Sequence, residues 1–214
     1  MKTHFLNADG AVIITDMIEA INENKQYLSD IDGLIGDGDH GINMNKGFQL
    51  CKEQLKAKPG DLAYSALALS KILMMKIGGS MGPLYGKLYK GFAKTLEGKE
   101  LIGMGEMRDA LNAMLASIQS ISPAVVGDKT LMDALVPAVN AFNFSVIESV
   151  SFVEALDAMA AAAEVGRDST KELVAKLGRA SRLGDRSIGV MDAGATSCCL
   201  LLQTLATSCK KLLA

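Results

Sequence analysis

The chain has 214 residues, of which 49% are hydrophobic, and this suits one domain over residues 1–214 with a sizeable buried core. Its 22 basic and 24 acidic residues give a net charge of -2, so we expect neither a nucleic-acid partner nor a membrane partner. The N-terminus lacks an apolar signal core, and no apolar run reaches ~18 residues, so we expect a cytoplasmic protein.

Apolar residues recur at three- and four-residue steps along almost the whole chain, which is typical of helices. The first helix is expected from Asp9 onward. Asp61 is the expected capping residue of the third helix, and Pro83 suits the first position of the fourth. The later helices are expected at residues 106–121, 130–146, 152–177 and 195–213. No convincing pair of alternating strands is present.

The breaks between these helices predict an all-α fold of eight antiparallel helices, an up-and-down bundle or barrel. They fall at residues 30–40, 57–61, 78–83, 97–104, 122–129, 147–151 and 178–194. Successive loops of such a bundle alternate between its two ends. The first, third, fifth and seventh breaks, which hold most of the Gly-, Asp- and Arg-rich sequence, therefore share one end. We expect a common site there.

Three acids lie close together in the first break: Asp32, Asp37 and Asp39. Carboxylate oxygens suit Mg²⁺ or Ca²⁺ rather than soft metals. The spacing of Gly and Glu does not fit an EF-hand. Mg²⁺ usually completes its shell with water and phosphate, so the acids favour a metal with a phosphorylated ligand. A capped turn with solvated acids is the alternative.

The third break, "IGGSMGPLYG", places Gly79 and Ser80 before a helix that contains Pro83. Backbone N–H groups at a helix start can hold phosphate. The stretch is not a Walker A motif, because no Gly-Lys-Ser/Thr follows. Taken alone, it fits a tight turn equally well.

In the fifth break, "VVGDKTLMD", Asp128 is best explained as a cap of the following helix. Leu131 and Met132 suit either an apolar wall for a nucleotide base or core packing. The cysteines, Cys51, Cys198, Cys199 and Cys209, form no C-x-x-C pair and are expected to be reduced thiols without zinc.

The seventh break carries four basic residues, Lys176, Arg179, Arg182 and Arg186, at the same end as the acids. Such residues suit an anion bridged to a metal. Asp192 and Gly194 begin the last helix, whose N–H groups face the same region. His40 is expected to hold a phosphate oxygen or ribose, with a role as a base as the alternative. Together these features predict a polyphosphate site for phosphoryl transfer.

Four stretches in this order resemble the L subunit of dihydroxyacetone kinase: "GDGDHGINMNKGF", "GGSMGPLYG", "VGDKTLMD" and "GRASRLGDRSIG..DAGATS". The resemblance implies one L-type nucleotide-binding domain with two Mg²⁺ ions held by Asp32, Asp37 and Asp39. It also implies ADP or ATP contacts, which are expected at His40, Gly41, Asn43, Gly79, Ser80, Met81, Thr130, Leu131, Arg179, Asp192, Ala193 and Gly194.

The family further implies that a ketose is held covalently on a histidine of a separate K subunit, and the catalytic residues of this chain stay unknown. Bound ADP is either rephosphorylated by a phosphohistidine protein of the phosphotransferase system or exchanged for ATP. Two departures from the family pattern are Met81, where Ser is frequent, and Asp192-Ala193-Gly194, where Asp-Pro-Gly is frequent.

Other functions fit the same residues. The chain also suits the L-type subunit of a kinase for a related sugar such as erythrulose. It suits an ADP-loaded regulatory module that docks on a transcription factor. A metal-dependent phosphohydrolase is less favoured, because no water-activating base other than His40 is evident. Whether the chain forms a homodimer stays open.

Overall fold

The computed structural model describes residues 2–214, and helices dominate it. The α-helices are α1 (Ala11–Ile35), α2 (His40–Ala57), α3 (Leu62–Lys76), α4 (Met81–Leu96), α5 (Met104–Gln119), α6 (Met132–Ile147), α7 (Phe152–Ser169) and α8 (Ala193–Leu213). Two short 3₁₀ helices, η1 (Thr170–Glu172) and η2 (Ala180–Ser187), lie between α7 and α8. The all-α prediction is confirmed.

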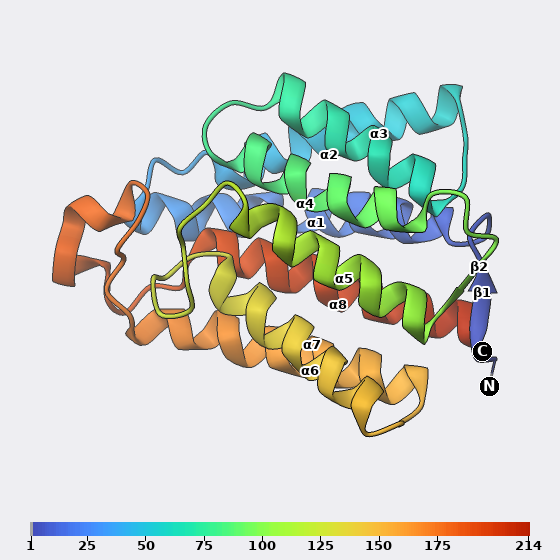
Figure 1. Cartoon of the computed structure of the whole chain (residues 1–214). Coiled ribbons are helices and arrows are strands. Elements are labelled where there is room, and N and C mark those ends of the chain that lie inside the picture. Colours follow the sequence, from blue (N-terminus) through green and yellow to red (C-terminus); the bar gives the residue numbers. More distant parts are fainter. Residues whose placement is uncertain (1) are drawn as a thin grey trace.

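The helices lie side by side along one direction, and each packs against the next in the sequence (Figure 1). The last helix, α8, also packs against α1, so the order of neighbours closes on itself. The loops that follow α1, α3, α5 and α7 lie at the end opposite the two chain termini (Figure 1). We call this the pocket end, and the other the termini end.

A small antiparallel sheet at the termini end was not expected from the sequence. It pairs β1 (His4–Leu6) with β2 (Leu101–Gly103), with Phe5 opposite Ile102. Strands of three residues are too short to show an alternating pattern. Asn7, directly after β1, donates from Nδ2 to the carbonyls of Leu96 and Lys99 at 3.0 and 2.8 Å. This side chain joins the N-terminal segment to the end of α4.

Several helix boundaries differ from the sequence prediction, and three of them bear on the pocket end. Because α1 continues to Ile35, Asp32 lies in its last turn rather than in a loop. Because α4 begins at Met81, Pro83 is its third residue rather than its first, a position where proline still removes no helical hydrogen bond. Finally, α7 ends at Ser169 and not at residue 177.

Thr170 holds the chain where α7 ends. Its buried hydroxyl donates to the carbonyl of Arg167 at 2.6 Å and accepts from the N–H of Asp192 at 3.0 Å. This second bond joins the end of α7 to the start of α8. The apolar spacing of residues 170–177 resembles a helix, but the chain there turns away to form the pocket end.

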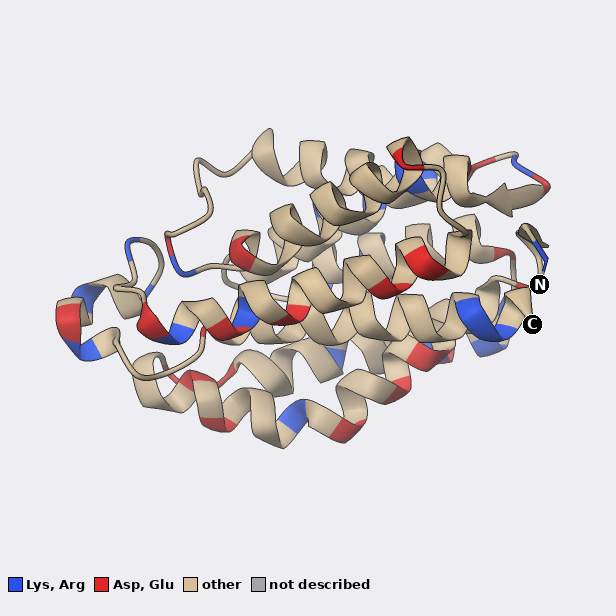
Figure 2. Ribbon diagram, turned by 90° about the horizontal axis from the view of Figure 1, so that it is seen from below, with Lys and Arg blue, Asp and Glu red and all other residues tan. Residues whose placement is uncertain are grey.

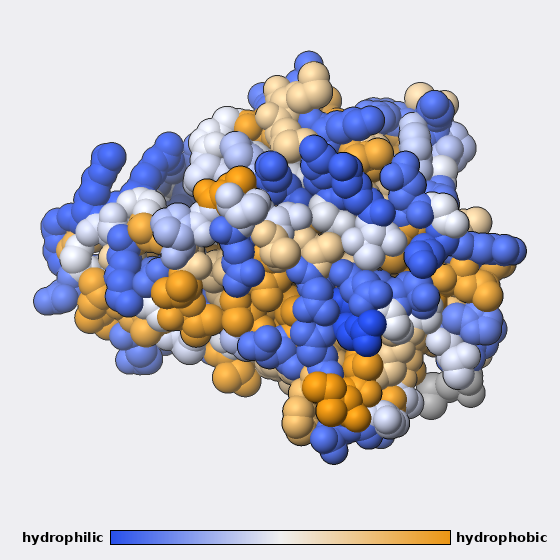
Figure 3. Space-filling model, in the orientation of Figure 1, coloured by the Kyte–Doolittle hydropathy of each residue, from blue (hydrophilic) through white to orange (hydrophobic). Residues whose placement is uncertain are grey.

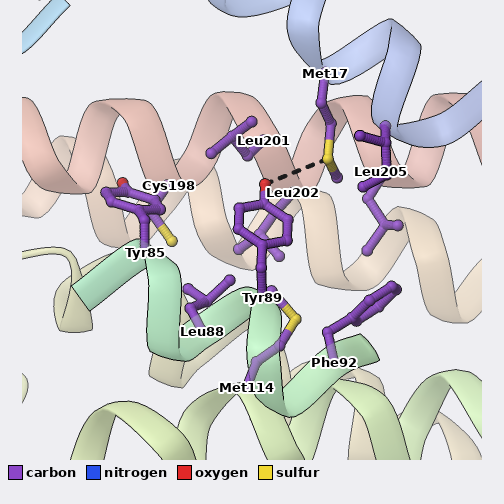
Figure 4. A pocket seen from close by; sticks show the side chains of 11 residues that line it. Met17, Tyr85, Leu88, Tyr89, Phe92, Met114, Cys198, Leu201, Leu202 and Leu205 are labelled. Atoms are coloured by element: carbon purple, nitrogen blue, oxygen red, sulfur yellow. Dashed lines mark hydrogen bonds between the residues drawn. The ribbon is translucent and has the colours of Figure 1, made fainter. Parts of the chain in front are cut away.

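The centre of the molecule is filled by side chains (Figure 4). Tyr85 and Tyr89 point inward from α4, toward residues of α8 and α1. The hydroxyl of Tyr89 donates to Sδ of Met17 at 3.4 Å. The cavity left among these side chains measures only about 10 Å³. The interior therefore offers no room for a nucleotide.

The four cysteines are all buried and unpaired, as expected for reduced thiols. Burial raises the pKa of Cys199 to about 11 and that of Cys51 to about 12, which keeps both thiols protonated at neutral pH. None of the helices in residues 2–214 combines the length and the apolar character that crossing a membrane requires.

Candidate functional site

A pocket of about 600 Å³ opens at the pocket end, within the size range of small-molecule sites. Its walls come from the loops after α1, α3, α5 and α7 and from the helices that follow them. All the expected site residues except Gly41 line it: Asp32, Asp37, Asp39, His40, Asn43, Gly79, Ser80, Met81, Thr130, Leu131, Arg179, Asp192, Ala193 and Gly194. The alternation of loops predicted from the sequence therefore brings these residues together.

The surface at the pocket end is strongly polar. Figure 2 shows basic and acidic positions close together along η2 and beside it. Figure 3 shows hydrophilic side chains projecting from the end of the molecule that carries η2. A charged ligand therefore meets a polar rim before it reaches the pocket.

Gly41 lies behind the pocket wall, in the first turn of α2. It is buried, and a Cβ atom at this position would overlap the backbone carbonyl of Lys25 in α1. Gly41 therefore has a packing role, and its expected nucleotide contact stays a prediction. Glycine is required here because the backbones of α1 and α2 approach each other closely.

The three acids form one cluster. Asp32, Asp37 and Asp39 each offer a carboxylate oxygen, and these oxygens lie within 4.8 Å of one another. The Asp32 carboxylate accepts from the N–H groups of Asp39 and His40 at 3.0 and 3.3 Å, which links the end of α1 to the start of α2. An all-oxygen donor set of this kind fits a hard divalent cation.

The carboxylates of the cluster also affect the pKa of Asp39. Burial raises the pKa of Asp39, and the negative charges of Asp37 and Asp32 raise it further, while Arg179 opposes them. A bound cation would offset this repulsion between carboxylates. The residues present therefore fit a magnesium ion.

Two basic side chains, Arg179 and the largely buried Lys129, lie on the pocket wall, and Arg179 is the one that contacts the acids. Its guanidinium pairs with Asp37 and lies 3.9 Å from Oδ1 of Asp39. The other three expected cations, Lys176, Arg182 and Arg186, are not among the lining residues. Lys176 instead forms a surface ion pair with Asp128 at 3.1 Å. The basic clamp expected from the sequence is thus reduced to Arg179.

The glycine-rich loop before α4 forms another part of the wall. Gly79 has a φ of +71°, which favours glycine over any other residue. Ser80 is the N-cap of α4, but its side chain makes no capping hydrogen bond. The first N–H groups of α4 are therefore left for a ligand, at the positive end of the helix dipole.

The loop after α5 supplies an apolar side of the pocket. Leu131, which is buried, lines it together with Ile118, Pro123 and Ala124. These side chains suit a nucleotide base. Asp128 does not cap the following helix as expected, because its carboxylate accepts from the N–H of Val125 at 2.9 Å.

The turn before α6 is held by Asp133, a residue that the sequence analysis did not single out. Its two carboxylate oxygens accept from the N–H groups of Gly127 and Thr130 at 2.6 and 2.7 Å. Asp133 is fully buried, so these bonds hold the residues before α6 in place.

His40 is held by two residues that the sequence analysis also missed. Its Nε2 lies 2.8 Å from Oγ of Ser197, which lies 2.7 Å from the hydroxyl of Tyr85. Burial lowers the pKa of His40 to about 4, although Asp32 opposes the shift, so the imidazole is neutral at pH 7. With Nε2 engaged, Nδ1 is the nitrogen left for a ligand.

Asp192 caps α8 and faces the same pocket. Its Oδ2 accepts from the N–H of Ala195 at 2.7 Å. Burial raises the pKa of Asp192 to about 7, with smaller contributions in the same direction from Asp133 and Asp32. The carboxylate is therefore easily protonated and responds to any charge placed in the pocket.

Comparisons with known proteins agree with this site. The DAK2 domain matches residues 34–207. The ADP-binding subunit DhaL of PEP-dependent dihydroxyacetone kinase 2 from Listeria innocua is 36% identical over 208 residues, 93% of each chain. The ADP-binding subunit DhaL of the PEP-dependent enzyme from Escherichia coli is 34% identical, over 90% of this chain and 92% of that protein.

A solved structure shows the same fold. The dihydroxyacetone kinase from C. freundii, in complex with AMP-PNP and Mg²⁺, aligns with a TM-score of 0.69 at 23% identity. The alignment covers 97% of this chain and 35% of that one. The DAK2 domain covers most of the chain, and the DhaL proteins match it at 34% identity or more over most of their length. The chain therefore belongs to the DAK2 domain family, in the group of DhaL-type subunits of dihydroxyacetone kinase.

Proposed function

We propose that this chain is the nucleotide-binding subunit of a dihydroxyacetone kinase, a phosphotransferase assembled from several subunits. One observation carries the proposal: three carboxylates within 4.8 Å of one another lie in the wall of a pocket of about 600 Å³. Relatives that match over most of their length are named as ADP-binding subunits of such kinases. The whole chain, residues 1–214, is proposed to act as one nucleotide-binding domain.

Asp32, Asp37 and Asp39 are proposed to hold two Mg²⁺ ions. When bound, Mg²⁺ neutralises phosphate charge and supports the charge that develops during phosphoryl transfer. The Asp32 carboxylate already accepts two backbone hydrogen bonds, so it is oriented before any ligand arrives. Asp37 and Asp39 are exposed and are free to adjust.

The remaining walls are proposed to position ADP or ATP. The N–H groups at Ser80 and Met81 meet phosphate oxygens, and Leu131 packs on the base. Arg179 reaches phosphate from the side of the acids. His40, Asn43, Thr130 and the start of α8 complete the enclosure. Positioning and charge neutralisation are most of what phosphoryl transfer requires from a protein.

The acceptor ketose is proposed to reside on a separate K subunit. Nε2 of His40, the histidine on the pocket wall, is engaged by Ser197, and no other histidine of the described residues lines the pocket to hold a ketose. The relatives are called PEP-dependent and ADP-binding, which favours the branch in which ADP stays bound. A phosphohistidine protein of the phosphotransferase system would then rephosphorylate it.

A reconstitution tests the proposal. The purified chain is mixed with a K subunit, PEP and the phosphohistidine proteins, and dihydroxyacetone phosphate is measured. We expect product only when all components are present and none with Asp37→Ala. Mass spectrometry of the purified chain should also show retained ADP. Product formation without this chain, or full activity of Asp37→Ala, would overturn the proposal.

The same assay distinguishes the acceptor. The chain is mixed in turn with a K subunit specific for dihydroxyacetone and with one specific for erythrulose, each with its own sugar. We expect the chain to support the dihydroxyacetone reaction, and support of the erythrulose reaction alone would assign the chain to the related kinase instead.

A further inference from the structure

Lys129 stands out at the pocket end because it is almost completely buried. Only 2% of its surface is exposed. Its backbone has a φ of +61°, in the left-handed region that a lysine rarely occupies. A buried cation in an unfavourable backbone conformation is retained only where the surrounding structure holds it.

The ammonium group of Lys129 is fully used by the protein itself. Nζ donates to the carbonyl oxygens of Leu173, Ser187 and Val190 at 3.1, 2.6 and 2.6 Å. An ammonium has three N–H donors, so these three bonds leave none for a phosphate. Burial lowers the pKa of Lys129, and Asp192 and Glu172 oppose the shift.

The three carbonyls belong to one segment, residues 170–192, which we call the arginine segment. Leu173 precedes η2, whereas Ser187 is the last residue of η2 and Val190 follows it. One ammonium therefore ties the incoming and the outgoing limbs of the segment to the turn before α6. Arg179 lies between these limbs, directly before η2, on the pocket wall.

Other polar bonds also hold the segment: the N–H of Lys176 donates to the carbonyl of Asp128 at 3.1 Å, and the N–H of Asp192 donates to Oγ1 of Thr170 at 3.0 Å. Two further bonds join its limbs. The N–H of Ala175 donates to Oγ of Ser187 at 2.9 Å, and the N–H of Gly189 donates to the carbonyl of Lys171 at 2.8 Å. Within the segment, Gly178, Gly184 and Gly189 have positive φ, so its backbone changes direction repeatedly. The Lys129 ammonium is the group that joins this backbone to another part of the chain through three bonds.

We propose that Lys129 is a positioning residue that fixes the arginine segment so that Arg179 reaches the nucleotide, and that Lys129 itself does not bind phosphate. The link to nucleotide binding rests on the proposed function. The claim that Lys129 holds the segment is independent of the proposed function, because it concerns the protein without any ligand.

The first test is limited trypsin digestion of the ligand-free protein. In Lys129→Met the carbonyls lose their donor, so cleavage after Arg179, Arg182 and Arg186 should accelerate at least about tenfold, because local opening becomes easier. Lys129→Gly is the second variant. Glycine accepts the positive φ and leaves room for water beside the carbonyls, so it should fold even if the methionine variant does not.

Lys171→Met is the matched control, because Lys171 lies in the same segment with an exposed side chain that joins no other part of the described structure. Its cleavage after the three arginines should match that of the wild-type chain. If both Lys129 variants keep a wild-type helical circular dichroism signal and are cleaved no faster than this control, Lys129 does not hold the segment and the proposal is wrong.

The second test separates positioning from general destabilisation. The affinity for Mg-ADP is measured by calorimetry for Lys129→Met, Arg179→Ala and the double variant. Each single change should weaken binding about tenfold, whereas the double variant should be no weaker than Arg179→Ala within about twofold, because Lys129 acts through Arg179. Losses that multiply to about 100-fold, or an unchanged affinity in Lys129→Met, would overturn the link to Arg179. If the wild-type chain does not bind Mg-ADP, the proposed function fails, and the trypsin result alone decides whether Lys129 holds the segment.

Discussion

The two ends of the helix assembly differ in which side chains accept from the N–H groups at the helix starts, and at each end one helix of residues 2–214, α1 or α4, begins without a side-chain cap. At the termini end, α3 is capped by Asp61, and α7 begins with a capping box formed by Ser151 and Glu154. The side chain of Glu106 likewise accepts from the N–H of Gly103 at the start of α5. At the pocket end, α8 is capped by its own N-cap residue, Asp192, whereas Asp32 and Thr130 accept from the first N–H groups of α2 and α6. In the described structure no side chain caps the start of α4.

The loops differ in the same way. Most glycines with positive φ lie at the pocket end, namely Gly38, Gly79, Gly127, Gly178, Gly184 and Gly189, whereas Gly98 lies at the termini end. The start of α4 combines a missing side-chain cap with a glycine of positive φ and a place on the pocket wall. The difference teaches that an uncapped helix start indicates a ligand site when it follows a glycine-rich turn and lies beside a pocket.

The largest effect on stability is expected from Gly41→Ala. The added methyl group overlaps the Lys25 carbonyl, so α1 and α2 must separate, and unfolding by urea should show a loss of about 3 kcal/mol. Gly105→Ala is the control, because nothing lies near its Cβ position in α5, and it should stabilise by about 0.5–1 kcal/mol. If Gly41→Ala and Gly105→Ala had the same free energy of unfolding, Gly41 would have no packing role.

A somewhat smaller effect is expected from Asp192→Asn in the absence of ligand and metal. Burial raises the pKa of Asp192 to about 7 from 3.8, so the native state binds the extra proton and the wild-type chain loses stability as pH rises between about 4 and 7. Asparagine keeps the cap but does not titrate. The variant should match the wild-type chain at about pH 4 and be more stable by about 2 kcal/mol at about pH 8.

Thermal unfolding at a series of pH values measures this difference. Its size should grow steadily with pH across that window. A stability difference that is constant with pH, or that favours the wild-type chain at pH 8, would show that burial does not raise the pKa of Asp192.

The smallest effect is expected at the termini end, from Asp61→Ala. Its carboxylate accepts from the N–H of Tyr64 at 2.7 Å, and loss of such a cap costs about 1 kcal/mol of stability. The affinity for Mg-ADP should not change, because the cap lies at the other end of the helices. Asp61→Asn, which preserves the acceptor, serves as the control, and a change in nucleotide affinity in either variant would weaken the distinction between the ends.

Features with a local cause could be predicted from the sequence. The helical period placed the helices, the Asp61 cap was recognised from its position, and the alternation of loops brought the acids and Arg179 to one pocket. These predictions succeeded because each depends on residues that are close in the chain. The three-residue strands and the early end of α7 were missed because no local pattern marks them.

Features that depend on distant partners could not be predicted. The contact between His40 and Ser197 joins residues 157 positions apart, and the Lys129 bonds reach 44 to 61 positions along the chain. Gly41 looked like part of a ligand motif, but its role is decided by the carbonyl of Lys25 in α1. Sequence alone identified the residues of this end without showing which of them contact the ligand and which hold the others.

The central claim is that the acid cluster at the pocket end binds a nucleotide through magnesium. Calorimetric titration with ADP, with and without Mg²⁺, tests it on the wild-type chain, on Asp37→Ala and on Asp9→Ala, a matched change of an exposed acid at the termini end. We expect Mg-dependent binding in the wild-type and Asp9→Ala proteins. Asp37→Ala should bind at least about 100-fold more weakly with its helical circular dichroism signal intact. An ADP affinity in Asp37→Ala equal to that of the wild-type chain would contradict the claim.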